Sequence, residues 1–218
     1  MSKPDFSKAF IDGRELEVES RSITFRCHTI GELVITTGGL VACDPFFCSA
    51  ARPLAARVPP GRYPVILSVA SIADDQRVAY AKLHVGDKPA SRWEMALLPD
   101  EELSSLKEGE VFGYSVDSGI GCYMDEEAAA IHLQKLDSDE EYEHHLTDEM
   151  ENNYVDTWDW ADINLNAATG ANIITFTSGW GDGFYPLYVG YDGDGSVVAL
   201  VTYFPLFEDQ EVYPGDDA

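Results

Sequence analysis

Residues 77–84 form the sequence Arg-Val-Ala-Tyr-Ala-Lys-Leu-His, in which valine, tyrosine, lysine and histidine alternate with alanine, alanine and leucine. Successive side chains of a strand point to opposite faces, so this alternation favours a strand. A second run, at 63–70, is rich in apolar and β-branched residues and comes just before it. Pro59-Pro60-Gly61 and Asp87-Lys88-Pro89 bracket the two runs, which favours an antiparallel arrangement with short connections.

Similar short runs occur on both sides of this pair. Upstream they are separated by Gly31 and by Gly38-Gly39, and downstream the last two are separated by Gly193-Asp194-Gly195, which predicts a hairpin. The expected further strands are residues 22–29, 32–35, 40–43, 92–98, 111–116, 172–177, 184–191 and 197–204.

Helices are expected only in the middle of the chain. A short helix is predicted to end near Leu106, and a longer one to begin after Asp125, whose carboxylate can cap it. A third, at 140–151, is so acidic that it needs a partner or an apolar seam through Tyr142, Leu146 and Met150. The sequence therefore predicts an α+β fold: one β-rich, sandwich-like domain of antiparallel sheets spanning residues 1–218, with a frayed tail at about 210–218.

The net charge of −25 is confined to the second half of the chain. Residues 1–100 carry 12 Lys and Arg against 12 Asp and Glu, whereas residues 101–218 carry 2 against 27. Such a field repels nucleic acid and anionic membranes and accelerates encounter with a basic surface. We therefore expect a basic protein partner, with no nucleic acid and no membrane. A solubility adaptation is the alternative, which the confinement to one half disfavours.

The remaining composition points to a cytoplasmic protein without cofactors. The first twenty residues contain no apolar stretch typical of an export signal. The cysteines are Cys27, Cys43, Cys48 and Cys122, and none forms a CxxC pair, so we expect free thiols and neither a disulfide nor a metal site.

The segment 137–162 combines acids with aromatic residues and is our candidate partner-binding surface. Carboxylates attract arginine and lysine, and aromatic rings anchor interfaces. Trp158 and Trp160 can equally be core residues, because tryptophan is usually buried. The candidate binding residues are Asp139, Glu140, Glu141, Tyr142, Glu143, Tyr154, Asp156, Trp158, Asp159, Trp160 and Asp162.

Three strings carry a family resemblance: Cys43-Asp44-Pro45, then Val116 to Asp125 with the pattern Val-Asp-Ser-Gly-Ile-Gly-Cys-Tyr-Met-Asp, and Ser178-Gly-Trp-Gly-Asp-Gly-Phe-Tyr-Pro186. They resemble a bacterial family called domain of unknown function 4241. The resemblance implies an association with toxin genes, and hence an immunity role in which the chain neutralises a basic toxin. The motif residues whose roles stay open are Asp44, Asp117, Asp125, Trp180, Asp182 and Tyr185.

Two alternatives to the immunity role remain. If the fold gathers Asp44, Asp117, Asp125 and Asp182, they can bind a divalent cation and serve a metal-dependent hydrolase, although their spacing matches no known loop. The simpler interpretation is structural, with glycines filling tight turns, Asp182 bonding backbone N–H groups and Asp125 capping a helix.

No catalytic residue is predicted, because no cysteine or serine lies in a recognisable nucleophile motif. A non-catalytic adaptor is the other alternative.

Overall fold

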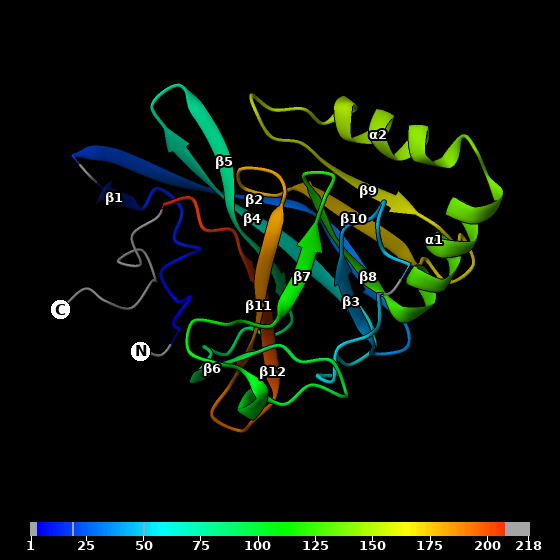
Figure 1. The fold of residues 1–218 in the computed structure, drawn as a ribbon, viewed down its shortest axis with the longest axis horizontal. Coiled ribbons are helices and arrows are strands. Elements are labelled where there is room, and N and C mark those ends of the chain that lie inside the picture. Colours follow the sequence, from blue (N-terminus) through cyan, green and yellow to red (C-terminus); the bar gives the residue numbers. More distant parts are fainter. Residues whose placement is uncertain (1–3, 19, 50, 208–218) are drawn as a thin grey trace.

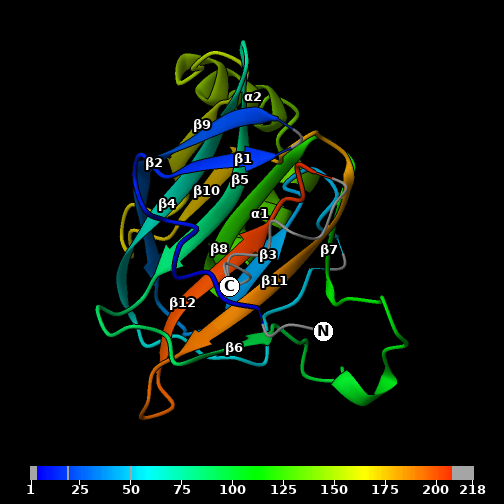
Figure 2. The same cartoon turned by 90° about the vertical axis from the view of Figure 1, so that its left-hand side faces the viewer.

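The computed structural model describes residues 4–18, 20–49 and 51–207. Two antiparallel sheets face each other, and two α-helices from the middle of the chain cover one of them, so the predicted α+β class is confirmed. In Figure 1 the large sheet, the small sheet and the helices follow one another from left to right, and Figure 2 views them from the large sheet's side. The predicted tail at 210–218 lies outside the described residues.

The large sheet has eight strands, and its central members are the hairpin that the alternating sequence predicts. β4 and β5 pair antiparallel, with Leu67 opposite Ala81. β7 lies off the main path, pairing with the first half of β11 while β6 pairs with the second half. The strand order is β1 (Glu15–Val18), β2 (Arg21–Ile35), β4 (Gly61–Ile72), β5 (Asp75–His84), β12 (Val197–Tyr203), β11 (Gly183–Tyr191) and β6 (Arg92–Met95), with β7 at Gly113–Val116.

The small sheet has the order β3 (Leu40–Cys43), β8 (Ile120–Asp125), β10 (Asn172–Thr177) and β9 (Trp160–Asn164). α1 (Glu126–Ser138) follows β8 directly, and α2 (Tyr142–Asn152) leads back towards β9; a single 3-10 turn, η1 (Leu103–Ser105), replaces the short helix predicted near Leu106. No helix within the described ranges has the length and apolar character needed to cross a membrane.

The main core lies between the two sheets. Tyr123 of β8 is fully buried there and donates its hydroxyl to the Ala81 carbonyl oxygen of β5, at 2.9 Å. The Tyr123 hydroxyl oxygen in turn accepts a hydrogen bond from the Thr202 amide of β12, at 3.1 Å. One buried phenol therefore joins the small sheet to two neighbouring strands of the large sheet, and its polar atom is satisfied as burial requires.

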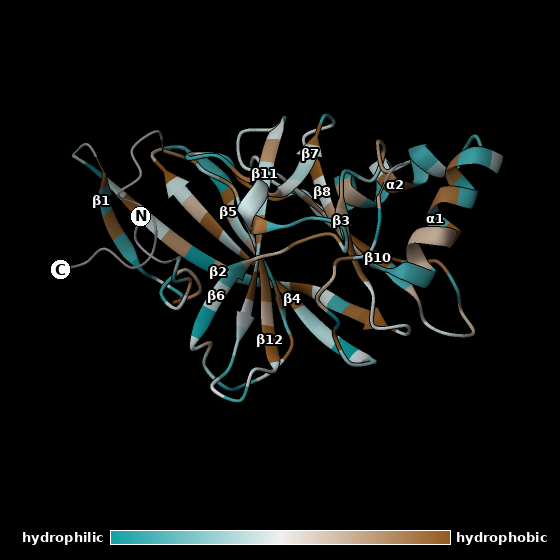
Figure 3. Cartoon of the chain, turned by 60° about the horizontal axis from the view of Figure 1, so that its bottom comes forward, coloured by the Kyte–Doolittle hydropathy of each residue, from teal (hydrophilic) through white to brown (hydrophobic). Residues whose placement is uncertain are grey.

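The helices form an outer layer on the small sheet. Tyr142, Leu146 and Met150 are buried on one face of α2, which confirms the predicted seam. Burying side chains of this size contributes about 1.5–3 kcal/mol each, which offsets the charge repulsion expected on the opposite face. The remainder of α2 is mostly hydrophilic, as Figure 3 shows.

One sequence prediction about strands was wrong, and one strand lies in a segment for which no strand was predicted. Residues 22–29 and 32–35 belong to one continuous strand, β2, with a register shift between Thr29 and Gly31. Gly31 is required there because a Cβ would overlap the Asp162 carboxylate of β9. β9 itself, predicted as part of a binding segment, is an edge strand paired with β10. Neither fact follows from local sequence, because both depend on contacts between distant segments.

Candidate functional site

The three family strings meet around one buried carboxylate. Asp44, which is 1% exposed, accepts hydrogen bonds from the backbone N–H groups of Asp117 and Ser118 through one oxygen, both at 2.8 Å. Its other oxygen accepts from the Phe46 amide at 2.8 Å. Ser178 then donates its amide to the Gly119 carbonyl at 2.9 Å. We call this meeting of loops the motif junction; Asp44 holds it together.

Asp125 performs a similar role at the far end of β8. It is 0% exposed and caps α1 by accepting from the Glu127 amide at 3.0 Å, as predicted. It also accepts from the Thr36 hydroxyl at 2.7 Å and the Thr37 hydroxyl at 3.0 Å. One carboxylate therefore ties the turn that follows β2 to the start of α1.

The carboxylates do not form the cluster that a metal-dependent hydrolase needs. In the β3–β8 pair, Cys43 lies opposite Cys122 and Leu40 opposite Asp125, which places Asp44 and Asp125 at opposite ends. Within residues 4–18, 20–49 and 51–207, no group of three or more His, Cys, Asp or Glu side chains could hold a metal ion. Among the described residues, the four acids on which the hydrolase alternative depends are therefore not gathered in one place.

The turn between β10 and β11 is held by serine and tyrosine. The Ser178 and Tyr185 hydroxyls both donate to the Gly181 carbonyl oxygen, at 2.8 and 2.6 Å. Gly179 and Gly181 have φ angles of 46° and 109°, which suit glycine. Asp182 is exposed and bonds no backbone N–H among the described residues, so the expectation that it stabilises this turn was wrong.

The buried thiols are not suited to nucleophilic chemistry. Cys43 and Cys122 lie with their Sγ atoms 3.6 Å apart, and this hydrogen bond, followed by burial, raises the pKa of the Cys43 thiol well above its ordinary value. Such a thiol stays protonated at neutral pH. His132 is also buried and fully engaged, with Nε2 donating to the Pro45 carbonyl at 2.7 Å and Nδ1 accepting from the Tyr142 hydroxyl at 2.8 Å. All four cysteines are unlinked.

The outer face of the helices carries acids without basic partners. Of the eight exposed carboxylates of α1, α2 and their link, Glu126 pairs with Arg57, and we define the acidic layer as the other seven, none of which forms an ion pair with lysine or arginine among the described residues. No lysine or arginine follows Lys135 in the chain, so local neutralisation is impossible. The layer consists of Asp137, Asp139, Glu140, Glu141, Glu143, Asp148 and Glu151.

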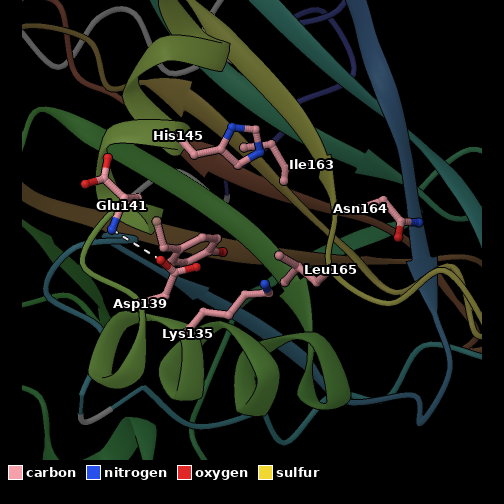
Figure 4. Close-up of a pocket in the computed structure, with 8 residues that line it drawn as sticks. Lys135, Asp139, Glu141, His145, Ile163, Asn164 and Leu165 are labelled. Atoms are coloured by element: carbon pink, nitrogen blue, oxygen red, sulfur yellow. Dashed lines mark hydrogen bonds between the residues drawn. The ribbon is translucent and has the colours of Figure 1, made fainter.

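A hollow of about 200 Å³ opens within this layer, between the helices and β9. Figure 4 shows Lys135 and His145 reaching it from α1 and α2, with Asp139 and Glu141 at its edge. Asp139 accepts from the Glu141 amide at 3.2 Å, which orders the link between the helices. No local sequence pattern predicts this hollow, since it depends on how the two helices pack on β9.

The predicted aromatic anchors divide into two groups. Tyr142 is buried in the seam of α2, and Trp158 is 2% exposed in the core between the sheets, so neither ring is available to a partner and their assignment as binding residues is corrected. Trp160 is half-buried against the same core. Tyr154, at 60% exposed, is the one predicted aromatic that faces solvent fully.

The last three predicted acids have different environments. Asp156 is exposed on the turn between α2 and β9. Asp159 is half-buried and accepts from the Thr177 hydroxyl at 2.5 Å. Asp162 accepts from the Asn172 side-chain amide at 2.6 Å, and Asn172 also bonds the Val34 amide of β2, at 2.9 Å. Asp162 thus links the two sheets through Asn172, a residue that the sequence analysis did not single out.

A shallow cleft of about 310 Å³ lies where the acidic segment reaches the motif junction. Four segments meet there: Arg77 of β5, the turn at 118–120, the loop at 154–159 and Trp180. Trp180 is 54% exposed, and its indole Nε1 donates to the Leu206 carbonyl at 3.0 Å. Asp117, Trp180 and Asp182 are thus motif residues that are exposed beside this cleft, whereas Tyr185 is buried at the start of β11.

The fold and these surfaces define a two-sheet α+β domain with an uncompensated acidic face and a buried, hydrogen-bonded motif junction. The chain belongs to the family described as protein of unknown function (DUF4241), whose sequence model matches residues 33–202. No curated protein and no solved structure matches the chain.

Proposed function

We propose that this protein is a stoichiometric binding protein that captures a basic protein domain through its acidic layer, and that the captured domain is a bacterial toxin that it neutralises. The acidic layer is the observation that carries the proposal. Seven exposed carboxylates lie together without lysine or arginine partners among the described residues, so only solvent, salt or a cationic partner can neutralise them.

Electrostatics favours a protein partner over other macromolecules. Nucleic acid and anionic lipid carry the same sign of charge as the layer and are repelled, whereas a basic surface is attracted over roughly the Debye length of about 8 Å at physiological salt. Inhibition by occupying a cationic groove requires complementary charge and no catalytic group. Neutralisation by binding therefore agrees with a buried, engaged His132 and with a Cys43 thiol whose pKa is raised well above its ordinary value.

The test starts from the genes next to this protein's own gene, among which the proposal expects one that encodes a basic toxin domain. Coexpression should restore growth that the toxin domain arrests, and the purified pair should associate in a 1:1 complex whose association slows steeply with salt. A toxin domain that still arrests growth, or that shows no association at low salt, would contradict the proposal.

A charge-matched pair of variants locates the surface. Changing Asp139, Glu140, Glu141 and Glu143 together to serine should slow association about tenfold. The control changes Glu15, Glu17, Glu102 and Glu108 to serine, which removes the same charge from exposed positions on β1 and around η1. If both variants slow association equally, net charge and not the acidic layer steers the partner.

A further inference from the structure

The cleft beside Trp180 has features that the acidic layer lacks. Trp180 and Tyr154 are large aromatic side chains exposed on its rim, and Val155 is also exposed next to Tyr154. Exposed aromatic groups around a concavity mark interaction sites, because leaving them in water forgoes the stabilisation that burial provides. The exposed rings around this cleft therefore indicate a binding site.

The aromatic rim is preorganised to bind a planar cation. The Arg77 guanidinium already stacks over the Trp180 ring, 4.9 Å from its centroid, and is itself paired with Asp75 at 2.8 Å. The hydrogen bond from Trp180 to Leu206 fixes the indole edge. The ring is thus held in position with much of its surface still exposed, and tryptophan is the aromatic side chain that binds cations best.

The opposite rim is a strained turn that holds its side chains in fixed positions. Val155 and Trp158 pair through two backbone hydrogen bonds, and the residues between them, Asp156 and Thr157, have φ angles of 29° and 73°. A tight turn with two positive φ angles normally contains Asn-Gly, and threonine is unfavourable there. The Thr157 hydroxyl offsets the strain by bonding both the amide and the carbonyl of Gln76. Tyr154 and Asp156 are therefore fixed beside the cleft.

The charges around the cleft are mostly negative. Asp117, Asp156 and Asp182 are exposed next to lining residues, and none of them has an ion-pair partner among the described residues. A guanidinium group would supply the positive charge that these carboxylates lack.

We propose that the cleft takes an arginine side chain from an extended basic segment of the protein partner. The inference rests on the proposed function and names the anchoring point for that partner. Arginine fits better than lysine because its planar guanidinium stacks on Trp180 and Tyr154 while its N–H groups reach several carboxylates at once. The cleft adjoins the acidic segment, so one basic segment can contact both.

The experiment is a titration followed by ¹H–¹⁵N NMR with the peptide acetyl-Gly-Arg-Gly-Arg-Gly-amide as probe. The amides of Gly119, Asp156 and Gly181 and the Trp180 indole should shift together, with a Kd of roughly 1 mM or tighter. The same peptide with citrulline, the neutral isostere of arginine, should bind at least about fivefold more weakly. Equal affinity for the two peptides would overturn the proposal.

Matched variants separate anchoring from general attraction. Trp180→Ala should weaken the arginine peptide about fivefold. Asp156→Asn should weaken it about two- to threefold while keeping the turn, because asparagine tolerates positive φ. Glu108→Gln, at an exposed position three residues after η1, should leave affinity unchanged. Thermal unfolding of each variant verifies the fold, and Asp156→Asn remains decisive if Trp180→Ala does not fold.

The location of the shifts distinguishes this inference from the proposed function. Shifts confined to α1 and α2, or no shift at millimolar peptide, overturn the arginine cleft and leave the acidic layer as the binding surface. Failure of the toxin domain to associate contradicts the proposed function whatever the peptide does. If wild type and Trp180→Ala bind the peptide equally, the cleft is not an arginine site.

Discussion

Buried acids of the motif junction and α1 differ from the acidic layer in how their charges are satisfied. Asp44 accepts three backbone N–H groups, and Asp125 accepts from one amide of α1 and two threonine hydroxyls. The carboxylates of the acidic layer are exposed and make no ion pair with lysine or arginine among the described residues. A buried charge is tolerated only when it is hydrogen-bonded, whereas an exposed charge is solvated by water and can still pair with a binding partner. Abundant acids in one chain thus serve two purposes, and only their surroundings distinguish them.

The largest effect on stability is expected at Trp158, a buried residue inside the acidic segment 137–162. Trp158→Ala should lower the free energy of unfolding by about 3–5 kcal/mol, because it leaves a cavity between the sheets. Trp180→Ala, on the exposed cleft rim, should lower it by only about 1 kcal/mol. Urea denaturation at pH 7 measures both. Equal losses would mean that the division into core and surface aromatics is wrong.

The next effect concerns the buried helix cap. Asp125→Ala removes the cap, about 1 kcal/mol, and charge-assisted hydrogen bonds from two threonines, so we expect a loss of about 3 kcal/mol in unfolding free energy. Glu126 is an exposed neighbour whose ion pair with Arg57 is long, at 3.8 Å. Glu126→Ala should therefore change the unfolding free energy by at most about 0.5 kcal/mol. Chemical denaturation of the two variants tests whether the hydrogen bonds that a carboxylate accepts, and not its charge alone, determine its contribution to stability.

A third prediction concerns Asp192, a hydrogen-bonded acid in the β11–β12 hairpin. The Ser196 and Asp194 amides, together with Lys88, lower the pKa of its carboxyl below the ordinary value. The stabilisation is therefore present above the unfolded pKa of about 3.9 and is lost as pH falls through the lower folded pKa. The stability difference between wild type and Asp192→Asn should shrink over that range. NMR titration of the carboxyl would refute this if its midpoint were not lowered.

The smallest expected effect on stability is at the acidic layer. Changing Asp139, Glu140, Glu141 and Glu143 together to serine should leave the unfolding free energy within about 0.5 kcal/mol or raise it slightly, because like charges are removed. Serine at position 139 can still accept a hydrogen bond from the backbone amide of residue 141, as Asp139 does in the wild type. Thermal and urea unfolding measure the change. A loss of several kcal/mol would show that these acids belong to the fold and not to a binding surface.

Much of the secondary structure could be predicted because it depends on neighbours in sequence. The alternation at 77–84 corresponds to β5, the acids after Asp125 correspond to a capped α1, and the seam of α2 is buried as expected. The tight turns of the motif strings were also predicted. The residues responsible were not, since Ser178 and Tyr185 hold the turn for which Asp182 was expected.

The sequence by itself determined the β-rich α+β class, the helix cap and the concentration of charge in the second half, since each depends on composition or on residues a few positions apart. Tertiary structure alone decided which acids are buried, that Trp158 lies in the core and that Gly31 makes room for Asp162. It also assembled the cleft from four segments, including Arg77 and Trp180, which are about a hundred positions apart in the chain. Such contacts leave no local pattern, because the energy that selects them comes from packing and hydrogen bonding across the two sheets.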